Sequence, residues 1–319
     1  MISHPAVPTN TTNQSRQCVC PVCSFPSVEK RAAGRDRLFH LAAGSFDLYR
    51  CLRCRCVFQD PPPENSALAS FYPREYWWSG AESGTGWLKL FFLNLEKAYR
   101  EFVTRGHARF VAECARARLR GERRLLDIGC GNGTFLKAAR GQGFTPHGMD
   151  VSARAVEIAR NLAGCQVKQG EIGSKLWEDS PFDLITMFHV LEHLPNPRMA
   201  LNYAKELLRP GGMLILQVPN VASMQARLFG ERWYGLDVPR HVINYTPEAL
   251  AHLLREEGFD FRLSTRFSLR DNPASIASSL SLWMDPIHRK GMELDPNPVL
   301  GGVVEIAYLG LFLLSPEEE

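Results

Sequence analysis

The segment LLDIGCGNG, residues 125–133, carries the clearest chemistry in this chain. Its glycines alternate with small residues directly after an apolar run, and such glycines let backbone N–H groups approach a ligand closely. The spacing is G-x-G-x-G rather than the G-x-G-x-x-G of dinucleotide-binding folds. Asp127 stands just before the glycines, where it would repel a pyrophosphate and attract an ammonium group. We therefore expect a ligand with a cationic group at this turn.

A second acidic residue, Asp150, ends the next apolar run, about 20 residues beyond the glycines. An acidic side chain at this place can accept hydrogen bonds from both hydroxyl groups of a ribose. Taken with Asp127, this predicts a nucleoside that bears a positively charged tail.

The cysteines are concentrated near the start of the chain, with six of the nine between Cys18 and Cys56. Two pairs have the C-x-x-C spacing, which lets two thiolates bind one tetrahedral ion. The four that complete an S4 site are Cys20, Cys23, Cys51 and Cys54. Cys18 and Cys56 are further candidates that could replace one of them, and the alternative is reduced cysteines without metal. Because four protein ligands leave no open position, we expect structural rather than catalytic zinc.

Composition indicates an ordinary globular protein. Of 319 residues, 45% are hydrophobic and 22% charged, and the formal charge is only +3. The arginines of residues 100–124 recur at helical spacing, which favours a solvated helix face over a nucleic-acid site. The cysteine cluster without an export signal favours a reducing cytoplasm. Residues 299–314, apolar apart from Glu305, are fewer than the roughly 20 that span a bilayer, so we expect a buried helix, with contact at a membrane surface as the alternative.

From residue 124 onward, apolar runs typical of strands alternate with segments of helical spacing. Expected strands are residues 125–128, 147–150, 182–188 and 213–218, and expected helices are residues 134–142, 153–162 and 197–208. Such alternation is typical of a parallel sheet covered by helices. A long helix over residues 87–119 is expected before this region, and a helix over 247–258 with a strand over 261–267 after it.

Four segments, in this order, resemble the class I S-adenosylmethionine-dependent methyltransferases: LLDIGCGNG, the acidic end of GMDVS, FDLITMFHVLEHL and LRPGGMLILQVPN. The resemblance covers residues 124–267. The paired cysteines, and WYGLDVPRH before YTPEAL, make the chain similar to the group that includes ubiquinone-biosynthesis O-methyltransferases, especially members with an N-terminal cysteine ribbon. The final antiparallel strand of that fold is not evident after Phe267.

The resemblance implies that the cofactor is S-adenosyl-L-methionine and assigns its contacts. The loop glycines would lie under the methionine moiety, Asp150 would bind the ribose, and Glu171 with Ile172 would lie near the adenine. Phe188 and His189 would line the methyl-transfer cleft. The full set of expected cofactor contacts is Asp127, Gly129, Cys130, Gly131, Asn132, Gly133, Asp150, Val151, Glu171, Ile172, Phe188 and His189.

A cluster of candidate catalytic residues, His189, Glu192, His193 and the later His241, follows from the same resemblance. Methyl transfer is an in-line displacement, so the protein must position the acceptor and, for a hydroxyl, remove its proton. A histidine that titrates near about pH 6 to 7 can take that proton, and we favour His193 over His189. Two alternatives stay open. The cluster binds a divalent ion, as in some relatives that have Glu where this chain has His189, or Glu192 and His193 only rigidify the loop before Pro195.

We predict an α/β fold: a doubly wound, mostly parallel Rossmann-like methyltransferase sheet with a small N-terminal zinc ribbon and a C-terminal helical extension. The expected parts are a disordered tail (1–16), a zinc-ribbon-like module (17–60), a linker with lid and helices (61–120), the S-adenosylmethionine-binding domain (121–270) and the C-terminal extension (271–319). Aromatic residues expected either in the wall of an acceptor pocket or in the core are Tyr72, Tyr76, Trp77, Trp78, Trp233 and Tyr234.

The predicted function is methyl transfer to a small-molecule acceptor such as a sugar, quinone, polyketide or lipid. The alternative from another class is a non-catalytic S-adenosylmethionine-binding scaffold that uses its zinc ribbon to recruit a partner. We expect neither a nucleic-acid partner nor a transmembrane helix, and the sequence leaves the oligomeric state open.

Overall fold

The computed structural model describes residues 18–72, 87–119, 121, 123–177, 181–260 and 278–280. Several expectations lie outside these described residues: the tail of residues 1–16, the aromatic residues 76–78, the strand over 261–267 and nearly all of the C-terminal extension. In the part of the chain that the structure describes, no helix is long and apolar enough to cross a membrane.

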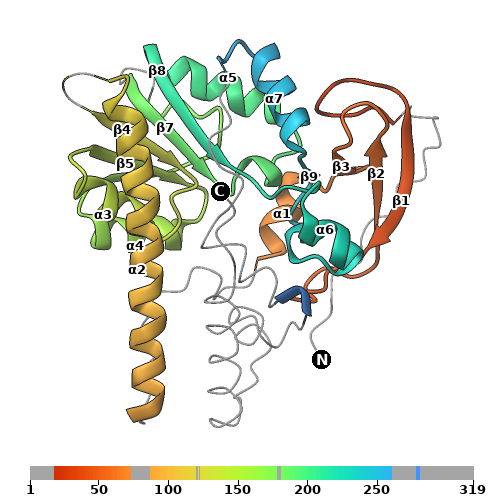
Figure 1. The fold of residues 1–319 in the computed structure, drawn as a ribbon, viewed down its shortest axis with the longest axis horizontal. Coiled ribbons are helices and arrows are strands. Elements are labelled where there is room, and N and C mark those ends of the chain that lie inside the picture. The colour runs from red at the N-terminus through yellow and green to blue at the C-terminus, as the bar shows by residue number, and fades with distance from the viewer. Residues whose placement is uncertain are drawn as a thin grey trace.

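Five strands form a parallel sheet in the order β6-β5-β4-β7-β8 (Figure 1). They are β4 (Arg124–Ile128), β5 (Thr145–Asp150), β6 (Gln166–Gln169), β7 (Phe182–Phe188) and β8 (Leu208–Gln217). The chain runs from β4 outward to β6 and then returns to β7 on the other side of β4, so the strand order reverses at the centre of the sheet. This confirms the predicted doubly wound parallel sheet, in which ligands bind beyond the carboxyl ends of the central strands.

One expected boundary is wrong. β8 begins at Leu208, not at residue 213, so no glycine-containing break separates it from the preceding helix. The ladder with β7 pairs Phe182 with Leu208 and then Leu184 with Met213, and its register shifts between these two pairs. The extra residues form an irregularity within the strand, a feature that strand and turn patterns do not distinguish from a loop.

Helices cover both faces of the sheet. Leu125 of β4 packs with residues of α2 (Trp87–Arg116), α3 (Thr134–Arg140) and α4 (Ala153–Ala163). The next residue, Leu126, packs with Tyr203 and Leu207 of α5 (Pro197–Leu207) on the opposite face. Successive side chains of a strand point to opposite faces, so a strand buried on both sides is apolar nearly throughout, which is why these strands read as continuous apolar runs.

Several helices begin with side-chain caps. The oxygens of Ser152, Asn196 and Thr246 accept hydrogen bonds from backbone N–H groups in the first turns of α4, α5 and α7 (Pro247–Glu256). Proline occupies the first turn of α5 and α7, where its missing N–H has no intrahelical partner to lose. These caps fix where the helices begin, and α4 begins directly after β5, where the predicted ribose carboxylate lies.

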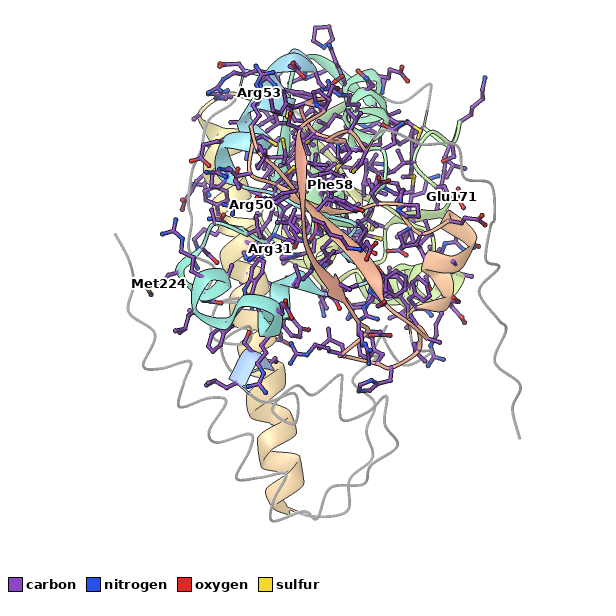
Figure 2. The ribbon with its side chains drawn as sticks, turned by 90° about the vertical axis from the view of Figure 1, so that its right-hand side faces the viewer. Arg31, Arg50, Arg53, Phe58, Glu171 and Met224 are labelled. Atoms are coloured by element: carbon purple, nitrogen blue, oxygen red, sulfur yellow. The ribbon has the colours of Figure 1, made fainter. Side chains whose placement is uncertain are left out.

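A second, antiparallel sheet has the order β1-β2-β3-β9. β1 (Val28–Gly34), β2 (Phe46–Cys51) and β3 (Val57–Gln59) belong to the cysteine module, which we define as residues 18–60, and they face the viewer in Figure 2. β9 (Ile243–Asn244) lies much later in the chain, after the last strand of the large sheet. The Gln59 side chain also donates hydrogen bonds to the carbonyl oxygens of Pro239 and His241. The cysteine module is therefore continuous, through β9, with the segment that follows the large sheet.

The remaining elements are short. They are α1 (Asn65–Ser70), α6 (Met224–Phe229) and the 3-10 turns η1 (Leu191–His193), η2 (Gly230–Arg232) and η3 (Tyr234–Leu236).

Candidate active site

The glycine loop joins β4 to α3 and adopts backbone conformations that favour glycine. Gly129, Gly131 and Gly133 all have positive φ angles, of 74°, 51° and 79°. A Cβ on Gly129 would lie 2.5 Å from Cγ2 of Val190, and a Cβ on Gly133 would lie 2.8 Å from Cα of Ala159. The loop is thus pressed between the end of β7 and α4, so these two glycines are required by packing as well as by any ligand.

Asp150 ties this loop to the end of β5. Its carboxylate accepts the N–H of Gly131 at 2.9 Å and the N–H of Ser152 at 2.9 Å. The side chain is only 3% exposed, and this burial raises the pKa of Asp150. The neighbouring Val151 is exposed, so its side chain does not contribute to the packing of the loop.

The expected adenine segment lies next to Asp150. The N–H of Gly170 donates to the carbonyl of Asp150 at 3.0 Å, which places Glu171 and Ile172 beyond the same edge of the sheet. Ile172 packs partly against the core, whereas Glu171 is exposed. The structure therefore brings the glycine loop, Asp150 and this pair together at the carboxyl edge of the sheet.

Three other expected cofactor contacts have structural partners. The Asp127 carboxylate is buried and accepts the hydroxyl of Thr186 at 2.7 Å. The Cys130 side chain is buried, and a Cβ on Gly148 would lie 2.9 Å from its sulfur. The Asn132 side chain accepts the N–H of Thr134 in the first turn of α3. The Cys130 side chain therefore packs into the core, with its sulfur 3.9 Å from the carbonyl oxygen of Gly131.

Phe188 ends β7 beside the glycine loop. Its ring lies edge-on to that of Phe135, 4.9 Å away, and stacks on that of His107, 5.5 Å away. His107 comes from α2, and no motif in the sequence distinguishes it from the other polar residues of that helix. It is the residue of this region that the sequence analysis missed.

His189 has a positive φ of 57°, an uncommon conformation for a residue with a side chain. Its N–H donates to the carbonyl of Gln217, and its Nδ1 lies 3.2 Å from Oε1 of Glu192. The turn at the end of β7 therefore directs the imidazole back toward the first helical turn of η1.

Glu192 is buried completely, and it is surrounded by three histidines. Burial alone would raise the pKa of this carboxyl, but the hydrogen bond to His189 and the charges of His193 and His241 hold it below its ordinary value. Its Oε2 atom has no hydrogen-bond partner among the described residues. A buried carboxylate oxygen without a partner is costly, so this atom marks a place that a cation or a donor would stabilise.

The cluster of Glu192, His193 and His241 is compact. One ligand atom from each residue lies within 4.8 Å of the others, and the two imidazole rings are 4.7 Å apart. Nδ1 of His241 lies 2.8 Å from the carbonyl of Gly235, which fixes the orientation of this ring. The three side chains thus converge from η1 and from the segment before β9.

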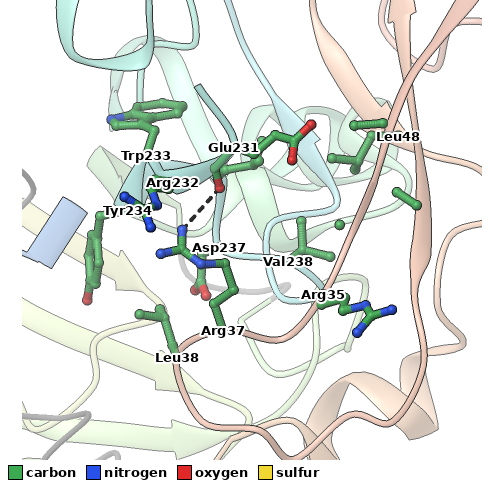
Figure 3. A pocket seen from close by; sticks show the side chains of 14 residues that line it. Arg35, Arg37, Leu38, Leu48, Glu231, Arg232, Trp233, Tyr234, Asp237 and Val238 are labelled. Carbon is green, nitrogen blue, oxygen red and sulfur yellow. Dashed lines mark hydrogen bonds between the residues drawn. The ribbon is translucent and has the colours of Figure 1, made fainter. Parts of the chain in front are cut away.

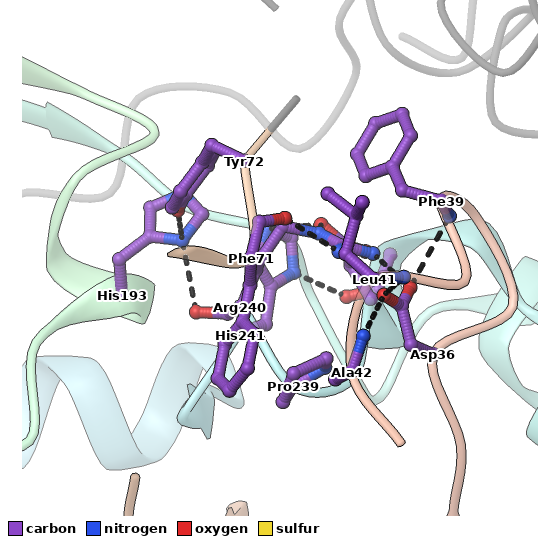
Figure 4. Close-up of polar contacts among 12 residues, drawn as sticks. Asp36, Phe39, Leu41, Ala42, Phe71, Tyr72, His193, Pro239, Arg240 and His241 are labelled. Carbon is purple, nitrogen blue, oxygen red and sulfur yellow. Dashed lines mark hydrogen bonds and ion pairs between the residues drawn. The ribbon is translucent and has the colours of Figure 1, made fainter. Parts of the chain in front are cut away.

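His193 differs from the expected histidine base. Burial, followed by the charge of His241, lowers the pKa of His193 to about 4. Its Nδ1 lies 3.0 Å from both the Tyr72 hydroxyl and the carbonyl of Arg240 (Figure 4). The ring is therefore neutral at pH 7, but with this pKa it is a weaker proton acceptor than the sequence analysis assumed.

The buried Arg240 side chain connects several segments next to His193 and His241. Its guanidinium is fully buried and contacts Asp237 at 2.6 Å, Asp36 at 2.9 Å and the carbonyl of Phe71 at 3.1 Å. The two carboxylates raise its pKa against the opposing effect of burial. Figure 4 shows how this side chain connects the cysteine module to the backbone that holds His193.

The four cysteines predicted to bind zinc lie together, with sulfur atoms all within 4.8 Å. Cys20 and Cys54 are 3.6 Å apart, as are Cys23 and Cys51. Sulfurs bound to one tetrahedral zinc at about 2.3 Å would be about 3.8 Å apart, so the donor set and its spacing fit this ion. The sulfur of Cys56 lies 3.4 Å from that of Cys20 and 3.3 Å from that of Cys54, just outside the four.

Comparisons with known proteins agree with the sequence resemblance. The family model described as methyltransferase domain matches residues 99–263. The ubiquinone biosynthesis O-methyltransferase of Paraburkholderia phytofirmans is 30% identical over 179 residues, which is 52% of this chain and 76% of that protein. The enzyme of the same name from Thiobacillus denitrificans is 29% identical over 157 residues, 46% of this chain and 67% of that protein.

Among solved structures, an S-adenosylmethionine-dependent methyltransferase from Thermotoga maritima is 26% identical, covering 54% of this chain and 81% of that one, with a TM-score of 0.40. At that TM-score the likeness adds no weight, and the family assignment rests on the sequence matches. The family model spans more than half of the 319 residues. The chain therefore belongs to the methyltransferase domain family and is an S-adenosylmethionine-dependent methyltransferase.

Proposed function

We propose that this protein transfers a methyl group from S-adenosylmethionine to a hydroxyl of a small molecule, beside the cluster of Glu192, His193 and His241. The observation that carries this proposal is the position of the cluster, which follows β7 directly and lies next to the glycine loop through the contact of Val190 with Gly129. The relatives named above are O-methyltransferases, which supports oxygen as the acceptor atom.

The cofactor would lie along the carboxyl edge of the sheet. The loop from Gly129 to Gly133 would lie under the methionine moiety, Asp150 would accept the ribose hydroxyls with its remaining lone pairs, and Glu171 with Ile172 would flank the adenine. Phe188 and His189, at the end of β7, would line the path of the methyl group. Positioning of this kind supplies much of the acceleration of an in-line displacement, because the reacting atoms are already aligned.

The cluster itself would hold a divalent cation. Glu192 Oε2 has no partner among the described residues, and the neutral imidazole of His193 offers a lone pair on the nitrogen that does not donate. Carboxylate and imidazole together suit first-row divalent ions. Such an ion would supply a positive charge that favours loss of the proton from an acceptor hydroxyl. His189 would keep Glu192 oriented through their 3.2 Å contact.

The alternative role, His193 as general base, is less well supported, because a base with a pKa of about 4 has a weak driving force for proton abstraction near neutral pH. We further propose that the four cysteines hold a structural zinc ion, because they offer no open coordination position.

Methyl transfer with and without a chelator tests this mechanism, with catechol as a simple hydroxyl acceptor and radiolabelled S-adenosylmethionine as donor. We expect a chelator to abolish transfer, a first-row divalent ion such as manganese to restore it, and Glu192→Gln to lose it. Arg105→Met, which removes an exposed charge on α2, is the matched control. Undiminished methyl transfer by the chelated protein would contradict the proposed divalent cation and would favour a histidine as the general base.

A further inference from the structure

A cavity of about 310 Å³ lies between β1 of the cysteine module and the segment that leads from η2 to η3 (Figure 3). It is separate from the glycine loop, and neither the cofactor contacts nor the cluster of Glu192, His193 and His241 line it. Asp237 lies in its wall and is the one lining residue that also contacts that cluster, through His241 at 3.8 Å.

Three arginines line this cavity: Arg35 and Arg37 from the cysteine module and Arg232 from the opposite wall. Arg37 is half-buried and donates to the carbonyl of Glu231 at 3.1 Å. Burial and the nearby charge of Arg232 both lower the pKa of Arg37, which shows that the two guanidinium groups share one environment.

None of these three arginines forms an ion pair with a carboxylate of the described residues. The neighbouring Arg240 provides the contrast. Arg240 is fully buried, and its guanidinium forms ion pairs with Asp36 and Asp237. The three cavity arginines have no such pairing and outnumber the two carboxylates of the lining, Glu231 and Asp237, so an anion in the cavity would reduce the repulsion between Arg37 and Arg232.

The lining also includes the carboxylates of Glu231 and Asp237, of which Asp237 is paired with Arg240, and the remaining walls are largely apolar. Leu38, Leu48, Trp233 and Val238 contribute to the walls, and Val238 packs so closely on Gly34 that a Cβ there would lie 2.7 Å from Cγ2. A cavity with apolar walls and a few converging charged groups is typical of a small-molecule site. Arginine binds phosphate through paired hydrogen bonds, and several arginines match the double charge of a phosphate ester better than the single charge of a carboxylate.

We propose that this cavity binds the phosphate group of a phosphorylated small molecule, with Arg37 and Arg232 contacting the anion, Arg35 at the rim, and the apolar walls holding the organic part. The inference concerns binding and is independent of the methyl-transfer reaction proposed above.

Calorimetric titration of the full-length, metal-loaded protein with phenyl phosphate and with inorganic phosphate tests this proposal. We expect phenyl phosphate to bind, and Arg37→Ala and Arg232→Ala each to raise its Kd by about 10- to 100-fold, the effect of losing one charged hydrogen bond. Arg31→Ala is the matched control, because Arg31 is an exposed arginine of β1 that does not line the cavity (Figure 2), and it should leave the Kd unchanged.

Arg232 is exposed, so its variant keeps the test valid even if Arg37→Ala fails to fold. No binding of phenyl phosphate by folded protein would overturn the proposal. So would an equal effect of Arg31→Ala, which would indicate nonspecific attraction to positive charge. Inorganic phosphate bound as tightly as phenyl phosphate would overturn the assignment of an organic ligand.

Discussion

Replacing Arg240 with methionine should destabilise this protein more than any other single loss of charge in the described residues. The substitution keeps an apolar stem of similar length and removes the guanidinium that contacts Asp36, Asp237 and the carbonyl of Phe71. Both carboxylates would stay buried without their cation, although Asp36 would keep hydrogen bonds from the N–H groups of Phe39 and Leu41.

The magnitude follows from this burial. Breaking a buried ion pair by removing one partner costs about 3–5 kcal/mol, because the remaining charge is left without compensation. Arg240 is 0% exposed and has two such partners, so we expect a loss in this range in the free energy of unfolding. Contact with the ring of Phe39, 4.4 Å from the guanidinium carbon, would be lost as well.

Urea unfolding followed by circular dichroism gives the measurement. A second substitution distinguishes charge from packing: Asp237→Asn in the Arg240→Met background removes one uncompensated carboxylate and should recover about 1–2 kcal/mol. Arg105→Met, which breaks an exposed pair with Glu101, should change stability by less than about 0.5 kcal/mol. A loss below about 1 kcal/mol in Arg240→Met, or no recovery in the double variant, would refute the reasoning.

Three further predictions concern the proposed sites. Asp150→Ala should weaken S-adenosylmethionine binding by about 1.5–3 kcal/mol, because a charged hydrogen-bond acceptor that also holds the glycine loop is lost; calorimetric titration would show it. Purified protein should carry about one zinc per chain by elemental analysis, and Cys51→Ser should release it while Cys165→Ser, outside the cluster, should not. Finally, His193 in chelated protein should have a pKa of about 6.5 in the unfolded chain and about 4 in the folded chain. Its neutral form therefore contributes fully to the free energy of unfolding above pH 6.5, and this contribution is lost as the pH falls toward 4. Urea midpoints should fall across this window, and less so in His193→Gln.

Most of the large sheet was predictable because its signals are local. The central strands β4 and β7 are apolar runs that are almost wholly buried, so their pattern indicates strands, whereas β6, with the sequence QVKQ and both ends exposed, was not predicted. The predicted start of β8, at residue 213, was wrong because the irregular residues before it resemble a turn in the sequence. β9 was not predicted at all, since a strand of two residues has no periodicity and forms only by pairing with β3.

The site was predictable only where its residues share a motif. Glu192 and His193 adjoin each other in the sequence, and their position after β7 brings them to the carboxyl edge of the large sheet. His107 reaches Phe188 through the packing of α2, and Asp36 reaches Arg240 across a separation of 204 residues. The pKa of His193 depends on burial that only the assembled structure supplies. Residue type and spacing thus indicate which groups can do chemistry, whereas tertiary contacts decide their protonation and their partners.

The cysteine module is joined to the candidate active site by packing and by backbone contacts. The cysteines pack in one hydrophobic cluster with Leu191 and Tyr245. The Tyr245 hydroxyl donates to the carbonyl of Leu191 at 3.4 Å, and burial, followed by the charges of Glu192, Cys56 and Cys20, raises its pKa. The backbone N–H of Val242, just before β9, donates to the carbonyl of Glu192 at 2.8 Å. A metal ion that orders the thiols would therefore also order β3, β9 and the turn that carries Glu192, so loss of zinc should disturb the cluster of Glu192, His193 and His241 as well as the cysteine module.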